Sequence, residues 1–281
     1  MTELNRIYKL AAIDVDGTLL NSHGKISTDI PPLLQEVQAR GIGVTLASGR
    51  PKLTLMPLLA ELGLALPYIS SGGAYIIDPA KGTIIDHQTL ERDVVTVMVE
   101  LARAAKMAIM AMEPERLYFE GDPAILELET RASKIDMTRI DGRQAEIIGV
   151  DDILQVRTKP SKLTICGDPA ILADVEGQIR ERKLPVYSTY SAPTYLEMTP
   201  AGVNKGTALK QLAAYLHIPM EGILVIGDSL NDISMFELAG MAVAMGNASE
   251  QVKAAANLIA PTNDENGVAW VLRELLLQAN N

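Results

Sequence analysis

The stretch Lys9-Leu-Ala-Ala-Ile-Asp14-Val-Asp16-Gly-Thr-Leu-Leu20 places two carboxylates directly after an apolar segment. Residues Lys9–Ile13 predict a buried strand, so Asp14 and Asp16 begin where that strand ends. Side chains at positions i and i+2 of an extended segment point to the same side, and we expect the two carboxylates to emerge together. In an open α/β sheet, ligands bind beyond the carboxyl ends of the strands, which is where both acids would lie. Taken alone, Asp-x-Asp is equally typical of an Asx-rich turn.

A second acidic cluster, Gly227-Asp228-Ser-Leu-Asn231-Asp232, follows another apolar segment, Ile223–Ile226. This cluster also would lie at a strand end. Carboxylates from two strand ends, with no His or Cys nearby, form an oxygen-only site that suits Mg²⁺ better than zinc or copper. Acids this close repel one another unless a cation or a shared proton relieves them. The alternative is that Asp228 and Ser229 only cap the helix that follows.

Two further motifs favour an anionic ligand. Ser48-Gly49-Arg50-Pro51 follows the strand predicted at Gly43–Ala47 and precedes a helix, so its hydroxyl and amides would face a helix N-terminus, where phosphates bind. Lys205 lies at the start of another predicted helix, where a cation is unfavourable unless it neutralises a phosphate or balances the carboxylates. The alternatives are an ordinary helix cap at Ser48 and a solvent-facing lysine at position 205. Lys205 is not part of a P-loop, because the Gly-x-x-x-x-Gly-Lys spacing is absent.

The whole chain repeats a unit of short apolar run, turn and amphipathic stretch, which is typical of an α/β fold with a parallel sheet. The rhythm changes where Ala74–Ile77 and Thr83–Asp86 flank a turn and predict an antiparallel hairpin. Residues 87–190 then predict a separate α/β unit, which includes a helix at Pro123–Ser133. We therefore expect a doubly wound parallel-sheet domain, formed by residues 1–86 and 191–281, with an α/β domain inserted at residues 87–190.

Composition excludes several classes of protein. The chain has 281 residues and a net charge of −10, which disfavours binding to nucleic acid. Aromatic residues make up only 4% of the chain against 48% apolar residues, so the core must be aliphatic. The one cysteine, Cys166, excludes an intramolecular disulfide and fits a reducing, cytoplasmic setting. No apolar run reaches the roughly 18 residues of a membrane helix.

Together and in this order, Asp14-Val-Asp16-Gly-Thr, Ser48-Gly-Arg, Lys205 and Gly227-Asp228-x-x-Asn231-Asp232 resemble the four motifs of the haloacid dehalogenase superfamily. The long insert between the second and third motifs is similar to the α/β cap of the Cof-type sugar phosphatase branch, as are Asn204-Lys-Gly206 and Glu265-Asn-Gly-Val-Ala269. The chain departs from many relatives at Gly72-Gly-Ala74, where they have Asn-Gly-Ala. This departure removes one polar side chain near the expected site.

The resemblance implies a role for each motif residue. Asp14 would be the nucleophile that forms an aspartyl-phosphate, and Asp16 would act as general acid and base. The phosphate group would be bound by Val15, Ser48, Gly49, Lys205 and Asn231. Mg²⁺ would be held by Asp14, Asp16 and Asp228. Asp232 would orient these ligands without binding the metal itself.

The same resemblance implies a phosphatase that hydrolyses small phosphorylated metabolites, often sugar phosphates, with no nucleic acid, membrane or obligate protein partner. The inserted cap would close over the core and supply contacts to the leaving group. Its candidate polar positions include Glu113, Glu115, Arg116 and Tyr118, and their pattern favours a salt-bridged solvent face over a contact with the substrate. Two other functions stay open: a phosphotransferase of the phosphomutase type, and a non-catalytic protein that binds phosphorylated metabolites.

Overall fold

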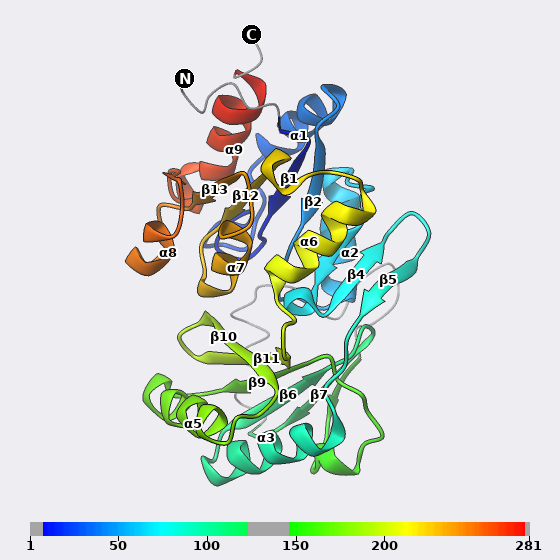
Figure 1. Cartoon of the computed structure of the whole chain (residues 1–281), viewed down its shortest axis with the longest axis vertical. Coiled ribbons are helices and arrows are strands. Elements are labelled where there is room, and N and C mark those ends of the chain that lie inside the picture. Colours follow the sequence, from blue (N-terminus) through cyan, green and yellow to red (C-terminus); the bar gives the residue numbers. More distant parts are fainter. Residues whose placement is uncertain (1–7, 123–145, 279–281) are drawn as a thin grey trace.

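The computed structural model describes residues 8–122 and 146–278, which form two stacked α/β units (Figure 1). One unit is built on a parallel five-stranded sheet, and the other on a mixed six-stranded sheet that is inserted into the first along the chain. The expected fold class, a parallel α/β core with an inserted α/β cap, is confirmed. We call these two units the core and the cap.

The core sheet is ordered β14-β13-β12-β1-β2, and all its neighbours pair in parallel. Its strands are β1 (Leu10–Ile13), β2 (Gly43–Leu46), β12 (Ile223–Gly227), β13 (Met241–Ala244) and β14 (Leu258–Ile259). The register aligns Ile13 with Leu46 on one side and with Ile226 on the other. The loops that follow these three central strands therefore leave the sheet at the same edge.

Both faces of the core sheet are covered by helices, as a doubly wound fold requires. The helices of the core are α1 (Ile30–Ala39), α2 (Lys52–Leu62), α6 (Lys205–Tyr215), α7 (Ile233–Phe236), α8 (Glu250–Ala254) and α9 (Gly267–Val271). In β1, Ala11 and Ile13 pack with α1, α2 and α9, whereas Leu10 and Ala12 pack with α6, α7 and α8. The alternation of side chains along a strand explains why this strand is apolar throughout.

An antiparallel hairpin extends the core toward the cap. Its sheet, β3-β4-β5, consists of β3 (Tyr68–Ser70), β4 (Tyr75–Asp78) and β5 (Thr83–His87). A single bridge between Ala47 and Ile69 joins it to the end of β2. The hairpin expected from the sequence is thus present, and β3 brings the turn at residues 71–73 next to the end of β2.

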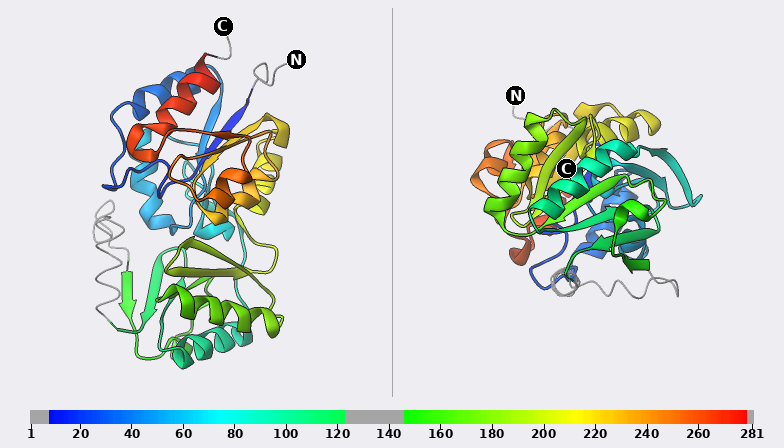
Figure 2. Two further views of the ribbon diagram at one scale, coloured as in Figure 1. Left: turned by 90° about the vertical axis from the view of Figure 1, so that its left-hand side faces the viewer. Right: turned by 90° about the horizontal axis from the view of Figure 1, so that it is seen from below.

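The cap sheet has the order β10-β11-β9-β6-β7-β8, in which only β7 and β8 pair in parallel. Its strands are β6 (Ala108–Met112), β7 (Arg116–Glu120), β8 (Glu146–Gly149), β9 (Lys162–Cys166), β10 (Val186–Ala192) and β11 (Tyr195–Pro200). Two helices, α3 (Arg92–Ala104) and α5 (Pro169–Glu181), cover the face turned away from the core (Figures 1 and 2). The opposite face of the cap sheet is therefore turned toward the core.

The expected division after residue 190 falls inside β10, and β11 also belongs to the cap sheet, so the chain returns to the core only after Pro200. A hairpin pattern alone does not tell which sheet the hairpin joins. The helix expected at Pro123–Ser133 lies outside the described residues.

Among the described helices, none is long and apolar enough to cross a membrane.

Candidate active site

The first acidic motif begins where β1 ends. The main-chain N–H of Asp14 still donates to the carbonyl of Ile226 on the neighbouring strand, at 2.9 Å. Asp14 is therefore held at the carboxyl end of β1. Its side chain is buried. Because β12 ends beside β1, the loop that carries Asp228 and Asp232 leaves the sheet next to Asp14.

Lys205 joins the two motifs. Its Nζ donates to Asp14 Oδ1 at 2.6 Å and to Asp232 Oδ1 at 2.7 Å, and its side chain is only 1% exposed. Lys205 begins α6, whose N-cap, Asn204, accepts a hydrogen bond from the N–H of Thr207. A buried cation at a helix N-terminus is thus stabilised by two buried carboxylates, which explains a position that sequence alone makes unfavourable.

The loop after β12 is held by Asp232. Its Oδ2 accepts hydrogen bonds from the main-chain N–H groups of Asp228 and Ser229, each at 3.0 Å. Asp228 is held in turn by the hydroxyl of Thr18, which donates to Oδ1 at 3.0 Å. Gly17 has a φ of +76°, and a Cβ there would lie 2.2 Å from Asp228 Oδ2, so any other residue would strain this turn and displace the carboxylate.

Burial and mutual repulsion perturb the acids of this cluster. Burial, together with the charges of Asp232 and Asp228, raises the pKa of Asp14 well above its usual value, although Lys205 counteracts this. Burial and the charge of Asp232 raise the pKa of Asp228 to about 7. Burial alone would lower the pKa of Lys205, but Asp14 and Asp232 outweigh it and raise this pKa. The site therefore has an excess of negative charge that a cation would relieve.

This donor set fits a hard divalent cation. Asp14, Asp228 and Asp232 each offer a carboxylate oxygen, and these oxygens lie within 4.8 Å of one another. They are the only such group of His, Cys, Asp or Glu within residues 8–122 and 146–278. Oxygen-only donors are typical of Mg²⁺ and Ca²⁺ sites. Because Asp232 already binds Lys205 and two N–H groups, Asp14 and Asp228 are the better placed ligands.

Asp16 lies outside this acid cluster. Its side chain is 57% exposed, and both carboxylate oxygens accept hydrogen bonds from the guanidinium of Arg50, with Nε 2.6 Å from Oδ2. The two acids of the Asp-x-Asp motif thus have different partners, a buried lysine for Asp14 and an arginine for Asp16. Arg50 belongs to the second motif, but sequence analysis predicted no role for it. Only the folded chain brings Arg50 next to Asp16.

The second motif forms a tight turn after β2. Ser48 is buried, and its hydroxyl accepts a hydrogen bond from the N–H of Arg50 at 3.1 Å. The carbonyl of Ser48 accepts from the N–H of Gly72 at 3.0 Å, and the carbonyl of Arg50 accepts from that of Ser71 at 2.9 Å. The turn at residues 71–73 is thereby fixed beside Gly49.

The remaining predicted phosphate ligands are buried near these motifs. Val15 has its side chain in the hydrophobic core, and its carbonyl accepts from the N–H of Leu20, so only its amide is left for a ligand. Asn231 lies in a 3₁₀ turn between Asp228 and Asp232 and is 5% exposed. Its Oδ1 finds no hydrogen-bond partner in the described part of the chain. Such an unpaired buried oxygen indicates a missing hydrogen-bond donor, whereas a phosphate oxygen would accept from the side-chain NH₂ of Asn231.

The cap contributes two charged residues that sequence analysis missed. Lys162, at the start of β9, donates from Nζ to the carbonyl of Gly49 and to Glu197 Oε1, both at 2.7 Å. Glu197 lies on β11, and both side chains are buried. Their signal in the sequence is a single charged residue in a strand whose other residues are mostly apolar. The cap therefore contacts the second motif directly.

The polar cap positions expected at residues 113–118 have other partners. Glu113 accepts hydrogen bonds from the hydroxyl of Thr158 and the N–H of Lys159, within the cap. Glu115 forms an exposed ion pair with Lys52 of α2, at 3.4 Å. Tyr118 packs into the hydrophobic core beneath the cap helices. These contacts fit a structural role for the turn between β6 and β7.

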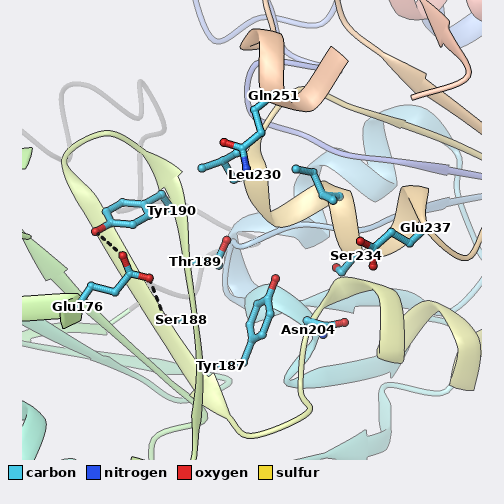
Figure 3. Close-up of a pocket in the computed structure, with 11 residues that line it drawn as sticks. Glu176, Tyr187, Ser188, Thr189, Tyr190, Asn204, Leu230, Ser234, Glu237 and Gln251 are labelled. Carbon is cyan, nitrogen blue, oxygen red and sulfur yellow. Dashed lines mark hydrogen bonds between the residues drawn. The ribbon is translucent and has the colours of Figure 1, made fainter. Parts of the chain in front are cut away.

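A cavity of about 450 Å³ lies beside this site, between β10 of the cap and α7 of the core (Figure 3). Tyr187 and Thr189 point into it from the cap, and Ser234 and Glu237 face them from the core. Burial raises the pKa of Tyr187. None of the acids of the cluster lines this cavity. It is thus a space at the junction of cap and core, separate from the acid cluster.

Comparison with known proteins identifies similar chains over nearly the whole length. Residues 11–272 match the family of haloacid dehalogenase-like hydrolases. The chain is 31% identical to Phosphatase YwpJ of Bacillus subtilis, over 95% of this chain and 100% of that protein. It is 30% identical to 5-amino-6-(5-phospho-D-ribitylamino)uracil phosphatase YcsE of the same organism, over 96% of each. A crystal structure of a haloacid dehalogenase-like hydrolase from Bacteroides thetaiotaomicron is 34% identical, with a TM-score of 0.79 over 95% of this chain and 98% of that chain.

Proposed function

The chain belongs to the haloacid dehalogenase-like hydrolases and is a phosphatase of that family. From this premise, we propose that it is a Mg²⁺-dependent enzyme that hydrolyses small phosphorylated metabolites through an aspartyl-phosphate. The observation that carries the proposal is the position of Asp14. Its carboxylate is buried at a strand end, held by Lys205 and accompanied by Asp228 within metal-binding distance.

In the first step, a carboxylate oxygen of Asp14 attacks phosphorus, and the bond between phosphorus and the ester oxygen breaks. The departing alkoxide takes a proton from the carboxyl group of Asp16, so the alcohol leaves neutral. Lys205 Nζ, 2.6 Å from Asp14 Oδ1, fixes the nucleophile and offers positive charge beside the phosphoryl oxygens. Ser48, Gly49, Asn231 and the amide of Val15 complete the proposed phosphate site.

In the second step, water attacks the phosphorus of the aspartyl-phosphate and gives a proton to the carboxylate of Asp16. The bond between phosphorus and Asp14 breaks, which restores the free carboxylate and releases inorganic phosphate. Asp16 can reach both proton transfers because its carboxylate is partly exposed, and Arg50 orients the ionised form that accepts the proton from water.

We assign Mg²⁺ to Asp14, Asp228 and the main-chain carbonyl of Asp16. Asp232 orients these ligands without binding the metal itself. The oxygen-only donor set and the raised pKa values of Asp14 and Asp228 support this assignment. When bound, the cation reduces the repulsion between an anionic nucleophile and an anionic phosphate. Asp232 supports Asp228 through its hydrogen bonds to the main chain of that loop.

YcsE acts on a phosphorylated ribitylamino compound, which supports a small phosphorylated metabolite, such as a sugar or polyol phosphate, as the substrate here. We propose residues 88–200 as the domain that sets substrate specificity and the flanking segments as the catalytic domain. A cytoplasmic location is supported by the single cysteine.

The test measures inorganic phosphate released from p-nitrophenyl phosphate and a panel of sugar phosphates, with Mg²⁺ and with EDTA. Wild type, Asp14→Asn and Asp174→Asn are compared, because Asp174 is an exposed aspartate of the cap. We expect Mg²⁺-dependent release that Asp14→Asn abolishes and Asp174→Asn leaves intact.

Three results would argue against the proposal. Full activity of Asp14→Asn would exclude Asp14 as nucleophile, and unchanged activity in EDTA would exclude the metal. An isomerised sugar phosphate with no phosphate released would identify a mutase instead.

A further inference from the structure

We propose that Tyr187 of the cap and Ser234 of the core are positioning residues, which link the cap to the main chain that carries Lys205 and Asn231. This inference rests on the proposed phosphatase function, in which those two side chains bind the phosphate group. It goes beyond that function by naming the residues through which the cap acts on the phosphate site. Both residues act through others and touch no reacting atom.

Ser234 connects two segments of the proposed phosphate site. Its hydroxyl accepts a hydrogen bond from the main-chain N–H of Gly206 at 3.1 Å and donates to the carbonyl of Asn231 at 3.2 Å. Gly206 follows Lys205 at the start of α6, and Asn231 lies in the loop after β12. One hydroxyl therefore sets the distance between the segment that carries the lysine and the segment that carries the asparagine.

The side chains of Lys205 and Asn231 follow the positions of their main chains. Both are buried, at 1% and 5% exposure, so neither can turn to another position without displacing its neighbours. Lys205 Nζ lies 2.6 Å from Oδ1 of Asp14, the proposed nucleophile. A misplacement of about 1 Å at such a group can lower a rate by about 100-fold. A residue that fixes the two main-chain segments therefore affects the reaction without touching the substrate.

Strand β10 of the cap runs beside the core segment that contains Ser234. Tyr187 points from β10 into the cavity beside the site, and Ser234 faces it from the core (Figure 3). Burial raises the pKa of the Tyr187 hydroxyl, and the neighbouring hydroxyls of Thr189 and Ser234 oppose this rise by hydrogen bonding. Further along β10, the carbonyl of Ser191 accepts a hydrogen bond from the hydroxyl of Ser229 at 3.3 Å. The cap thus meets this core segment at two points.

The hydroxyl of Ser234 has an acceptor position left for Tyr187. A serine hydroxyl donates one hydrogen bond and accepts up to two, and the N–H of Gly206 occupies one of the two acceptor positions. A hydrogen bond from the hydroxyl of Tyr187 fills the second position. Tyr187 then restrains Ser234, and through it the main chain at both of its partners. The link transmits the position of the cap to the segments that carry Lys205 and Asn231.

The experiment is a double-mutant cycle that consists of Tyr187→Phe, Ser234→Ala and the double variant. Hydrolysis of p-nitrophenyl phosphate gives kcat and KM, and calorimetric titration with inorganic phosphate gives a dissociation constant and a stoichiometry, both in the presence of Mg²⁺. Ser234→Thr is the conservative variant that keeps the hydroxyl. Tyr190→Phe and Ser188→Ala are matched controls, because these two hydroxyls line the same cavity but donate to Glu176 within the cap.

We expect Ser234→Ala to lower kcat/KM about tenfold and to raise the dissociation constant of phosphate about threefold, at unchanged stoichiometry. Tyr187→Phe should lower kcat/KM about threefold, and the double variant should lose no more than Ser234→Ala alone, because Tyr187 acts through Ser234. Ser234→Thr should restore most of the activity and the affinity. The control variants Tyr190→Phe and Ser188→Ala should match wild type in both measurements.

Losses that multiply in the double variant would overturn the link between cap and core. A Ser234→Ala variant whose dissociation constant is unchanged but whose stoichiometry is lower would be impaired in folding alone, which would overturn the positioning role. If wild type releases no phosphate from any ester, the phosphatase itself is overturned, and the dissociation constants of inorganic phosphate then decide the link. A wild type that neither hydrolyses esters nor binds phosphate would overturn both.

Discussion

The guanidinium of Arg50 holds the carboxylate of Asp16 through two hydrogen bonds, one of them 2.6 Å long between Nε and Oδ2. A bidentate arginine fixes the orientation of a carboxylate, which a lysine does not. We therefore predict that Arg50→Lys lowers kcat about 10- to 100-fold on alkyl phosphates, whose leaving group needs a proton from Asp16. The loss is smaller on p-nitrophenyl phosphate, because p-nitrophenolate leaves without protonation.

Steady-state kinetics on both classes of ester checks this role. Arg273→Lys is the matched control, because Arg273 pairs with Asp29 on the surface at 2.8 Å, neither residue belongs to one of the motifs, and both side chains are about half exposed. An equal loss of kcat on alkyl and aryl esters in Arg50→Lys would mean that Arg50 supports the fold or binds phosphate. It would not then position the general acid.

Lys205 stabilises the fold as well as the site. Lys205→Met leaves Asp14 and Asp232 buried without their cation, so we predict a loss of about 3 to 5 kcal/mol in the free energy of unfolding at pH 8. The loss should be smaller at pH 5 than at pH 8, because the raised pKa of Asp14 favours its protonation as pH falls, which removes one buried charge. Urea unfolding of the metal-free protein measures both values. Lys210→Met, on the exposed face of the same helix, should change stability by no more than about 0.5 kcal/mol, and a similarly small effect of Lys205→Met would contradict the prediction.

The sequence predicted the convergence of Asp14, Asp228 and Lys205 because each lies next to a clear strand or helix boundary, and strand ends of a parallel sheet meet at one edge. Contacts between side chains that meet only through the tertiary structure could not be predicted in this way. Arg50 meets Asp16, and Lys162 meets Gly49, only after the turns and the cap are in place. A charged residue in a strand otherwise indicates a solvent-facing position.

The elements that sequence analysis missed are short or lack a pattern. β13 has four residues, all apolar, and β14 has two, so neither gives a period that distinguishes a strand from a helix. The domain boundary was misplaced because β10 and β11 form a hairpin whose pattern is the same in either sheet. The pairing of β11 with β9 places this hairpin in the cap sheet, and that pairing joins residues about thirty positions apart in the sequence.

The raised pKa of Asp228 predicts how stability depends on pH. Its folded value of about 7 lies above its ordinary value of 3.8, so between these values the folded state holds a proton that the unfolded state does not. This proton favours folding most at low pH, and the metal-free protein should lose stability as pH rises from about 4 to about 7. Mg²⁺ competes with the proton, so its affinity should weaken as pH falls through about 7.

Thermal unfolding at pH 5 and pH 8, with EDTA and with Mg²⁺, measures both effects. We expect Mg²⁺ to raise the melting temperature clearly at pH 8 and only slightly at pH 5. Asp228→Asn should flatten the pH dependence of the metal-free protein and remove the effect of Mg²⁺. A Mg²⁺ effect of equal size in Asp228→Asn would exclude Asp228 as a ligand.

Gly206 and Gly177 both lie in helices but should respond in opposite ways to alanine. A Cβ on Gly206 would lie 2.0 Å from the main-chain carbonyl oxygen of Ser234, so Gly206→Ala must push α6 away from α7, at a cost of about 1 to 3 kcal/mol. Because Lys205 precedes Gly206, the shift should also draw Nζ away from Asp14 and lower kcat. Gly177, in α5, has nothing within 4 Å of the same position, and Gly177→Ala should stabilise the protein by about 0.5 to 1 kcal/mol without a change in kcat. Unfolding and turnover measured on both variants test this contrast, which fails if Gly206→Ala matches wild type in either measurement.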